Sequence, residues 1–283
     1  EAFSAKMNKF AFAVALPALL FQDISAVDIR ESWNGGFVLF CFIATFLSIT
    51  GVTVLSFFVV KREERGEFVQ GAYRSSAAIL GIAFIQNIYG TSGMAPLMII
   101  GTVPLYNAFA VIVLSLLKPG QRKMDKALLQ KTLKGIVTNP IILGIAAGFV
   151  WAILKIPQPE ILQKTVKNMA VLATPLGLMA MGASFEGKKA LGKLKPTLIA
   201  SALKLVVLAA IFLPIAVWLG YRESELVAIL VMLGSATTVS SFVMARNMGH
   251  EGVLTSSIVM VTTLCSAFTL TGWLFLLKTL GLV

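Results

Sequence analysis

Two apolar segments of this chain have glycine, serine and threonine at their centres. The first reads YRSSAAILGIAF at 73–84, and the second reads LGSATTVSSFVM at 233–244. Glycine loosens a helix, and short hydroxyl side chains satisfy backbone groups that a break leaves unpaired. We therefore predict that each segment is interrupted near its middle. The candidate binding residues of the two segments are Arg74, Ser75, Ser76, Gly81, Gly234, Ser235, Thr237, Thr238 and Ser240.

Interrupted helices of this kind can bind anions. The second half of a broken helix begins with unpaired N–H groups, and the helix dipole adds about half a positive charge there. Two such ends that face one point would form an anion site. The alternative is structural, because small residues in membrane helices allow close packing and serine often bonds its own helix. The match between the two segments favours a site.

The charged residues support an anionic ligand. All thirteen Asp and Glu residues fall in loops or at the ends of apolar segments, whereas Arg74 and Lys204 lie inside such segments. Buried cations in membranes tend to be paired or functional. Arg74 could hold a carboxylate with two hydrogen bonds or snorkel to the interface. Lys204, near the bilayer centre, is a further candidate binding residue with a functional or counter-ion role, and the alternative is a neutral lysine. The prediction of an anionic ligand depends on there being no carboxylate beside the interruptions.

A further candidate is Asn139, which precedes Pro140 at the start of another apolar segment. This position is typical of a helix cap, with a gating role in transport as the alternative. We include Asn139 among the candidate binding residues. The single histidine, His250, cannot form a metal site alone, and Cys41 and Cys265 lie in apolar segments that suggest no disulfide framework. No metal, cofactor or catalytic residue is expected.

The composition shows which elements must position these residues. Hydrophobic residues make up 57% of the chain, charged residues make up 13%, and the mean hydropathy is +0.87. A soluble domain has about a quarter of its residues charged. The net charge of +11 comes from basic residues in short loops, so nucleic-acid binding is not expected. The lipid bilayer is therefore the expected surrounding of an all-α, multi-pass protein of the plasma membrane.

Nine apolar stretches are long enough for membrane helices, at about 20 residues each. One set of alternating loops holds sixteen Lys and Arg residues and the other holds six, which places the first set in the cytoplasm. The predicted spans are residues 8–24, 36–60, 68–88, 93–117, 136–155, 161–185, 196–219, 226–246 and 252–280.

The two halves of the chain resemble each other at a nearly constant offset. Pro17 matches Pro175, and the glycines of YGTSG at 89–93 match those of MGHEG at 248–252. Spans one to four therefore pair with spans six to nine in opposite orientation, the inverted repeat of secondary transporters. Span five has no partner, so we expect a first helix before Glu1 and ten helices in the intact protein. The alternative is a natural nine-helix protein. The repeats are residues 1–117 and 135–283, joined by a cytoplasmic linker at 118–134.

Several motifs together resemble the auxin efflux carrier family, which includes bacterial malate- and malonate-type permeases. They are LPALLF at 16–21, FVQGAYRSSAAILG at 68–81, VPLYN at 103–107, NPIILG at 139–144, TPLGLMAMGASF at 174–185 and SSFVMARNMG at 240–249. The resemblance implies crossed broken helices that bind a carboxylate anion where spans three and eight cross. Ser76 stands where the family commonly has Asn, and Ala83 and Ala236 stand where it has proline.

We therefore predict a transporter or uniporter of a small mono- or dicarboxylate, driven by the membrane potential or by a proton carried on the substrate. A homodimer is a possible assembly. The first alternative is a cation–proton antiporter or a sodium-coupled carrier of the same fold, which would need a mid-membrane carboxylate. The second is a membrane-embedded enzyme, which would need clustered acids, histidines or a nucleophile with a base.

Overall fold

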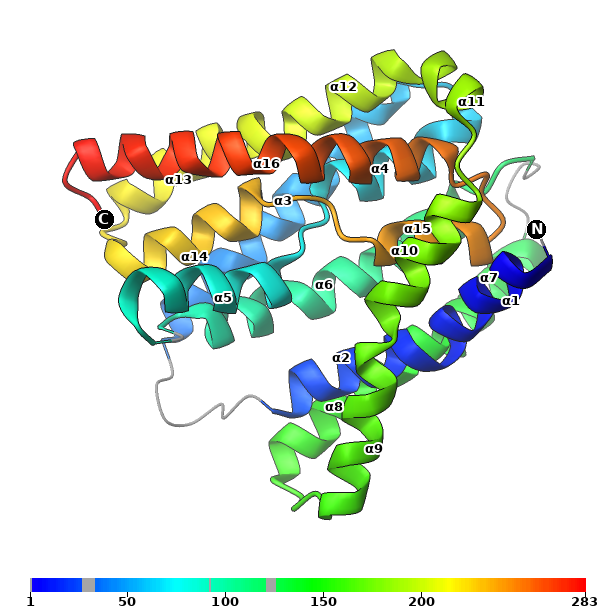
Figure 1. Cartoon of the computed structure of the whole chain (residues 1–283), viewed down its shortest axis with the longest axis horizontal. Helices are drawn as coiled ribbons and strands as arrows, with labels where there is room; N and C mark the ends of the chain where they lie inside the picture. The colour runs from blue at the N-terminus through cyan, green and yellow to red at the C-terminus, as the bar shows by residue number, and fades with distance from the viewer. Residues whose placement is uncertain (1, 27–33, 92, 121–125) are drawn as a thin grey trace.

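The computed structural model describes residues 2–26, 34–91, 93–120 and 126–283, with only the backbone of residues 2, 79–80, 126–129 and 131. Every regular element in these ranges is a helix (Figure 1). The all-helical class is therefore confirmed. The charged residues of the sequence that lie outside the described residues are Glu1, Asp28, Arg30, Glu31, Arg122, Lys123 and Asp125.

Six of the predicted spans are helices long and apolar enough to cross a membrane. Three of them are continuous α-helices, and the other three contain a wide or interrupted turn. The continuous ones are α3 (Gly35–Val59), α6 (Ala95–Leu116) and α16 (Val253–Thr279). The others are α1 (Ala2–Phe10) with η1 (Ala11–Ala15) and α2 (Leu16–Ser25), α9 (Glu160–Val171) with α10 (Ala173–Ala183), and α12 (Leu194–Ala202) with η3 (Leu203–Val207) and α13 (Leu208–Trp218).

The other three predicted spans are shorter helices. Span five is α8 (Pro140–Leu154), of 15 residues. Spans three and eight are both interrupted, as α4 (Arg65–Tyr73) with α5 (Ala77–Tyr89) and as α14 (Glu223–Gly234) with α15 (Ser240–Asn247). The loops contain η2 (Arg62–Glu64), α7 (Lys126–Val137) and α11 (Gly187–Gly192). Helix α7 occupies part of the predicted linker.

The elements follow the same order in both halves of the chain. A helix with a disturbed turn, a long helix, an interrupted helix and a last long helix occur in α1–α6 and again in α9–α16. The matched glycines also share a conformation: Gly90 and Gly93 have φ of 75° and 48°, and Gly249 and Gly252 have φ of 86° and 77°. Glycine is the residue that adopts this left-handed region without a steric penalty. The opposite orientation of the two halves in a membrane stays a prediction.

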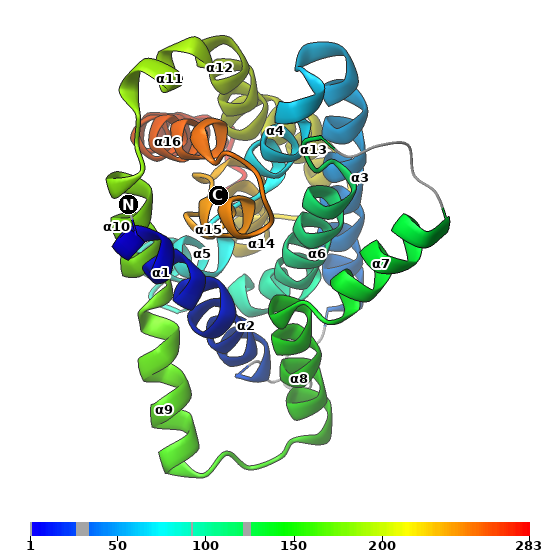
Figure 2. The ribbon, with the colours of Figure 1, turned by 90° about the vertical axis from the view of Figure 1, so that its right-hand side faces the viewer.

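The helices form two groups, which we name the core bundle and the side panel. In the core bundle, α3, α6, α12–α13 and α16 surround the interrupted helices α4–α5 and α14–α15. In the side panel, α1–α2 packs against α8, α9 and α10. Figure 2 shows α2, α8 and α9 in the lower part of the molecule, below the core bundle. The panel meets the bundle mainly where α10 and α1 contact α15 and where α8 contacts α6.

A proline sets the irregular turn of the first panel helix. Pro17 has no backbone N–H, so the carbonyl four residues before it cannot be bonded in the usual way. The chain compensates with the π-helical turn η1, in which Leu16 donates to Ala11 five residues earlier. The matched Pro175 lies three residues after Leu172, where α9 ends and α10 begins. A bulge of this kind is an established cause of helix kinks.

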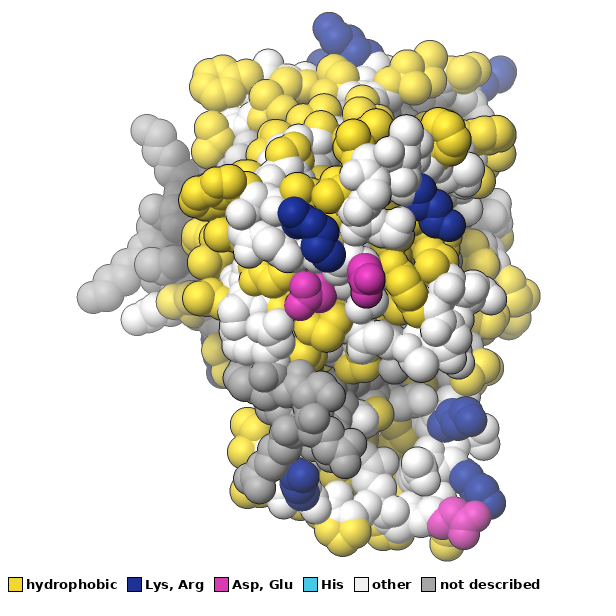
Figure 3. All heavy atoms as spheres, turned by 90° about the vertical axis from the view of Figure 1, so that its left-hand side faces the viewer, with side chains coloured by type: hydrophobic (Ala, Val, Ile, Leu, Met, Phe, Trp, Pro, Cys, Tyr) yellow, Lys and Arg dark blue, Asp and Glu magenta, His cyan; other side chains and the backbone are white. Residues whose placement is uncertain are grey.

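Large apolar side chains cover much of the outer surface, as expected for lipid surroundings, and several polar side chains are buried within the largely apolar interior. Phe58 and Trp218 are 83% and 82% exposed, whereas Gln70, Arg74 and Lys204 are at most 3% exposed. Figure 3 shows the end that carries the C-terminus, where hydrophobic side chains spread over much of the face and charged ones are scattered among them. The polar groups that could bind a ligand are therefore enclosed between helices.

Candidate functional site

The two helix interruptions contact each other and satisfy each other's backbone. The N–H of Ser76 donates to the carbonyl of Ala236 at 3.0 Å, and the hydroxyl of Thr237 donates to the carbonyl of Gly71 at 2.7 Å. The hydroxyl of Ser75 donates to the carbonyl of Met232. A membrane helix that breaks must pair its freed groups inside the protein. Each interruption therefore supplies partners that the other one needs.

The carbonyl end of α14 receives further donors. Tyr106 Oη donates to the carbonyl of Met232 at 2.8 Å, and Lys204 Nζ donates to the carbonyl of Leu233. The last carbonyls of a helix lack partners within the helix, and a cation there is favoured by the dipole. Lys204 is fully buried in the π-helical turn η3. The structure thus places the ammonium group of Lys204 at the C-terminal end of α14, the first half of span eight.

Arg74 follows the last residue of α4 and points into the protein. Its Nη1 donates to Met244 Sδ at 2.6 Å, and its Nη2 donates to Asn107 Oδ1. Asn107 is held in turn because its Nδ2 donates to the carbonyl of Val103 at 2.8 Å. These partners carry no charge, and within the described residues no carboxylate forms an ion pair with Arg74. The buried guanidinium is therefore held by neutral partners and has no ion pair among the described residues.

A cavity of about 50 Å³ lies at the interruptions, and we name it the crossover cavity. Five predicted residues line it: Arg74, Ser75, Ser76, Thr238 and Ser240. The hydroxyls of Thr238 and Ser240 lie 3.2 Å apart. No side chain caps the start of α5 at Ser76 or of α15 at Val239. The rest of the lining is Leu16, Leu19, Leu20, Asp23, Ala77, Ala78, Val103, Tyr106 and Asn107.

The lining corrects one expectation from the sequence. Asp23 lies on the cavity wall, so the expectation that no carboxylate stands beside the interruptions is wrong. Asp23 is near the end of its predicted span, but α2 runs alongside the interruptions. Because Leu16, Leu20 and Asp23 are spaced by four and three residues, they share one face of α2. The position of Asp23 in the sequence indicated its depth along the helix, but not which other helices this face of α2 packs against.

The other predicted residues lie outside the cavity. Thr237 and Ser235 are buried within the contact between the interruptions, and Ser235 Oγ has no partner among the described residues. Gly81 packs against Met98, where a Cβ would be 2.7 Å from Met98 Cε. Three further residues have structural partners: Gly234 ends α14, Lys204 bonds Leu233, and Asn139 Oδ1 accepts from Ile141 N at 3.0 Å as the cap of α8.

Sequence reasoning missed Asp23, Tyr106 and Asn107. Tyr106 and Asn107 both belong to the motif VPLYN in α6, whose polar residues stand in an apolar helix. That pattern was a usable signal, because buried polar side chains in membranes tend to be functional. In the part of the chain that the structure describes, no three or more His, Cys, Asp or Glu residues are grouped as metal ligands would be.

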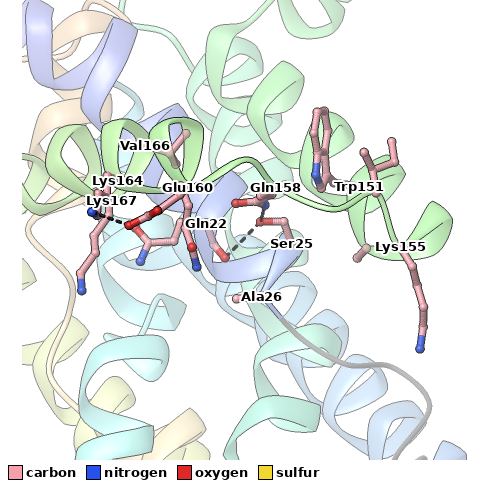
Figure 4. Close-up of a pocket in the computed structure, with 13 residues that line it drawn as sticks. Gln22, Ser25, Ala26, Trp151, Lys155, Gln158, Glu160, Lys164, Val166 and Lys167 are labelled. Carbon is pink, nitrogen blue, oxygen red and sulfur yellow. Dashed lines mark hydrogen bonds and ion pairs between the residues drawn. The ribbon is translucent and has the colours of Figure 1, made fainter.

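Two larger grooves, each of about 750 Å³, lie along the panel helix α1–α2, one at each end. The outer groove is formed by α2, α8 and α9, and in Figure 4 Gln158 points toward Ser25 while Glu160 meets Lys164. The distances are 3.1 Å from Gln158 Nε2 to Ser25 Oγ and 2.6 Å from Lys164 Nζ to Glu160 Oε1. The inner groove contains residues 4, 5, 8 and 9 of α1 and the end of α15. Along α1–α2 the inner groove, crossover cavity and outer groove therefore follow in order.

Comparison with known proteins identifies two similarities. The profile of a family described as "Membrane transport protein" matches residues 2–274. A protein of Rhizobium meliloti (strain 1021) named "Putative malonate transporter" is 26% identical, over 96% of this chain and 86% of that protein. Both similarities extend through the interrupted helices and the crossover cavity.

Proposed function

This chain belongs to the membrane transport protein family, and we propose that it carries a small organic anion, a mono- or dicarboxylate, which binds at the crossover cavity. The membership confirms the resemblance to auxin efflux carriers and agrees with a multi-pass membrane protein of six candidate spanning helices. The relative's name supports a dicarboxylate such as malonate as the cargo.

The observation that carries the proposal is that Arg74, a buried cation on the cavity wall, has no ion-pair partner among the described residues. Its side chain is 3% exposed, lines the crossover cavity and has only neutral partners among the described residues. A buried charge without a counter-charge is costly. A substrate carboxylate in the cavity would supply that counter-charge and could accept charge-assisted hydrogen bonds from the guanidinium.

The half-helix ends add to the same positive potential. Helix α5 begins at Ala77 and α15 begins at Ser240, and both of these residues line the cavity. The first N–H groups of a helix are unpaired within it and favour an anion. The hydroxyls of Ser76, Thr238 and Ser240 offer further donors. The site would therefore bind a carboxylate through one cation, two helix ends and neutral hydroxyls.

The size of the cavity bears on the transport cycle. A volume of about 50 Å³ has room for about two water molecules, so a dicarboxylate needs it to widen. The panel provides Leu16, Leu19, Leu20 and Asp23, and the core bundle provides the other walls. Movement of panel against bundle would widen the cavity and join it to one groove at a time, the alternating access of such folds.

A cation carrier of the same fold is the second candidate, and Asp23 is the observation that favours it. Because a carboxylate lies on the cavity wall, the proposal of an anionic cargo cannot rest on the absence of an acid. It rests on Arg74 and on the similarity to the protein named as a malonate transporter. A cation in the cavity would share it with the guanidinium of Arg74, which would repel it. An anion would balance Arg74, and we therefore prefer the anion.

Uptake into vesicles tests the proposal. The purified chain is reconstituted and supplied with radiolabelled malonate, malate, indole acetate or sodium, at set membrane potentials. We expect saturable uptake of a carboxylate and none of sodium. Ser76→Leu should fill the cavity and reduce uptake at least tenfold with the fold retained. The control Thr271→Leu changes an exposed residue of α16. Uptake of sodium without any carboxylate would reject the proposal.

A further inference from the structure

Asp23 is an acid on the wall of the crossover cavity that the proposed anion binding does not use. It lies on the cavity face of α2 with Leu16, Leu19 and Leu20, opposite Ser76, Thr238 and Ser240 of the bundle. Its side chain is half-buried. A carboxylate in an anion site opposes the ligand, so its presence there requires an explanation.

No partner neutralises this carboxylate in the part of the chain that the structure describes. No hydrogen bond or ion pair involves Asp23 there. Arg74 lines the same cavity, but its two terminal nitrogens bond Met244 and Asn107 instead. The cavity thus contains a cation and an acid that are not bonded to each other.

The other ionisable groups around Asp23 are few. In the cavity they are Arg74 and Tyr106. Helix α8, which packs on α2, has no ionisable side chain in Pro140–Leu154. Helix α9 presents Glu160, Lys164 and Lys167 to the outer groove, together with Gln22 and Ser25 of α2. Among these described groups, Asp23 is the one acid on the cavity itself.

We propose that Asp23 takes up a proton when the anion binds, so that the protein carries one proton and one anion in the same direction. This inference rests on the proposed function. A negative Asp23 and a negative substrate in one small cavity repel each other, and the repulsion is strong where water is scarce. A proton removes the repulsion and makes Asp23 a hydrogen-bond donor.

The step is balanced in atoms and charge. On the open side, a proton from solution joins one Asp23 carboxylate oxygen, and the anion binds beside Arg74. On the other side, the anion leaves, and without its repulsion the Asp23 carboxyl group ionises again: its O–H bond breaks and the proton passes to solution. A monovalent anion then crosses without net charge, and a divalent anion crosses with one net negative charge. Transport should therefore respond to a pH gradient and, for monovalent anions, little to the membrane potential.

The test is accumulation of radiolabelled malonate in vesicles with the full chain. With the inside one pH unit more alkaline, the potential clamped at zero and protein-free vesicles subtracted for passive permeation, one proton per anion gives about tenfold accumulation. Asp23→Asn should lose this accumulation and keep exchange of labelled for unlabelled malonate at equal pH. Asp23→Glu should retain part of it. The controls Glu63→Gln, an exposed acid of η2, and His250→Gln should accumulate like the wild type.

Different failures have different meanings. If the wild type carries no anion, the proposed function fails. If it carries malonate but Asp23→Asn accumulates it equally, or if accumulation requires sodium in place of choline, the inference about Asp23 is wrong. Should Asp23→Asn not fold, the wild type can still overturn the inference: a pH dye outside the vesicles should record about one proton taken up per malonate, and no proton movement would reject it.

Discussion

Ser76 and Ala236 are joined by a backbone hydrogen bond of 3.0 Å although they are 160 residues apart in the sequence. Each lies in the non-helical stretch between two half-helices, so this bond ties the two interruptions together. A backbone bond requires no particular side chain. The contact can therefore persist here although the family resemblance implies asparagine and proline at the positions of Ser76 and Ala236.

The side chain of Thr237 should stabilise the same contact. Thr237→Val keeps the shape but removes the donor to the Gly71 carbonyl, which is 2.7 Å away and buried. Leaving this acceptor unpaired should cost about 1–3 kcal/mol of unfolding free energy. Thermal unfolding in detergent measures the loss. The control Thr271→Val removes an exposed bond within α16 and should change stability by less than about 0.5 kcal/mol. Equal effects of the two would contradict the assigned role of Thr237.

The packing of the side panel should depend on Gly144. A Cβ at this position would lie 2.7 Å from the carbonyl oxygen of Pro17 and 2.9 Å from its Cα. These are backbone atoms that cannot turn aside, so Gly144→Ala should destabilise the protein by about 1–3 kcal/mol. Gly51→Ala is the matched control, because a Cβ there meets nothing within 4 Å and the helix should gain about 0.5–1 kcal/mol. A neutral Gly144→Ala would show that α2 and α8 pack more loosely.

Much of the fold could be predicted from the sequence, because lipid imposes simple rules. Long apolar runs had to be helices, and hydroxyl and glycine residues in the middle of such runs marked the two interruptions at 74–76 and 235–239. The matched glycines near 90 and 250 also have the shared backbone conformation that a repeat predicts. These features depend on local composition, which a sequence shows directly.

The lateral arrangement of the helices was the part that the sequence could not supply. Asp23 looked like the end of a span, yet α2 places it on the cavity, and Asn107, which stood out in the sequence only as part of a motif, accepts a hydrogen bond from Arg74. Lys204 was predicted as a functional cation at mid-depth, and it bonds the carbonyl of Leu233 instead of facing the cavity. The surroundings of each of these residues depend on which helix packs against its own helix. Such contacts join residues that are far apart in the chain, so local sequence does not show them.

Stability should fall in mild acid because of His250, which lies between α15 and α16. Its Nε2 donates to the carbonyl of Leu114 at 2.9 Å, and its Nδ1 has no partner among the described residues. Burial lowers the pKa of His250 below its ordinary 6.5, and the nearby Glu67 only partly opposes this. The folded state therefore prefers neutral His250, so this contribution is present above pH 6.5 and is lost as the pH falls.

The measurement compares unfolding of the wild type with that of His250→Gln from pH 7.5 to 5.5. Glutamine can still donate to the Leu114 carbonyl but does not titrate, and the chain has no second histidine. The wild type should lose stability relative to the variant toward pH 5.5. Parallel curves would show that His250 can be protonated in the folded state without a penalty.

The charge and shape of Arg74 should control which anions are carried. Arg74→Gln removes the cation from the cavity, and the loss of a charge-assisted hydrogen bond is worth about 1.5–3 kcal/mol, or about 10- to 150-fold in KM. Arg74→Lys keeps the charge but lacks the planar guanidinium that bonds Asn107 and Met244. Its KM should therefore lie between that of the wild type and that of Arg74→Gln. The dicarboxylate malonate should lose more affinity than the monocarboxylate indole acetate, because it has more charge to balance.

Two checks separate this effect from damage to the fold. Lys189→Gln removes one positive charge from the exposed surface and should leave the KM for malonate unchanged, since an exposed charge is screened by salt. Unfolding temperatures of both Arg74 variants show whether the bonds to Asn107 and Met244 matter for stability alone. If Arg74→Gln is folded and carries malonate with the KM of the wild type, Arg74 does not contact the cargo and the binding site lies elsewhere in the protein.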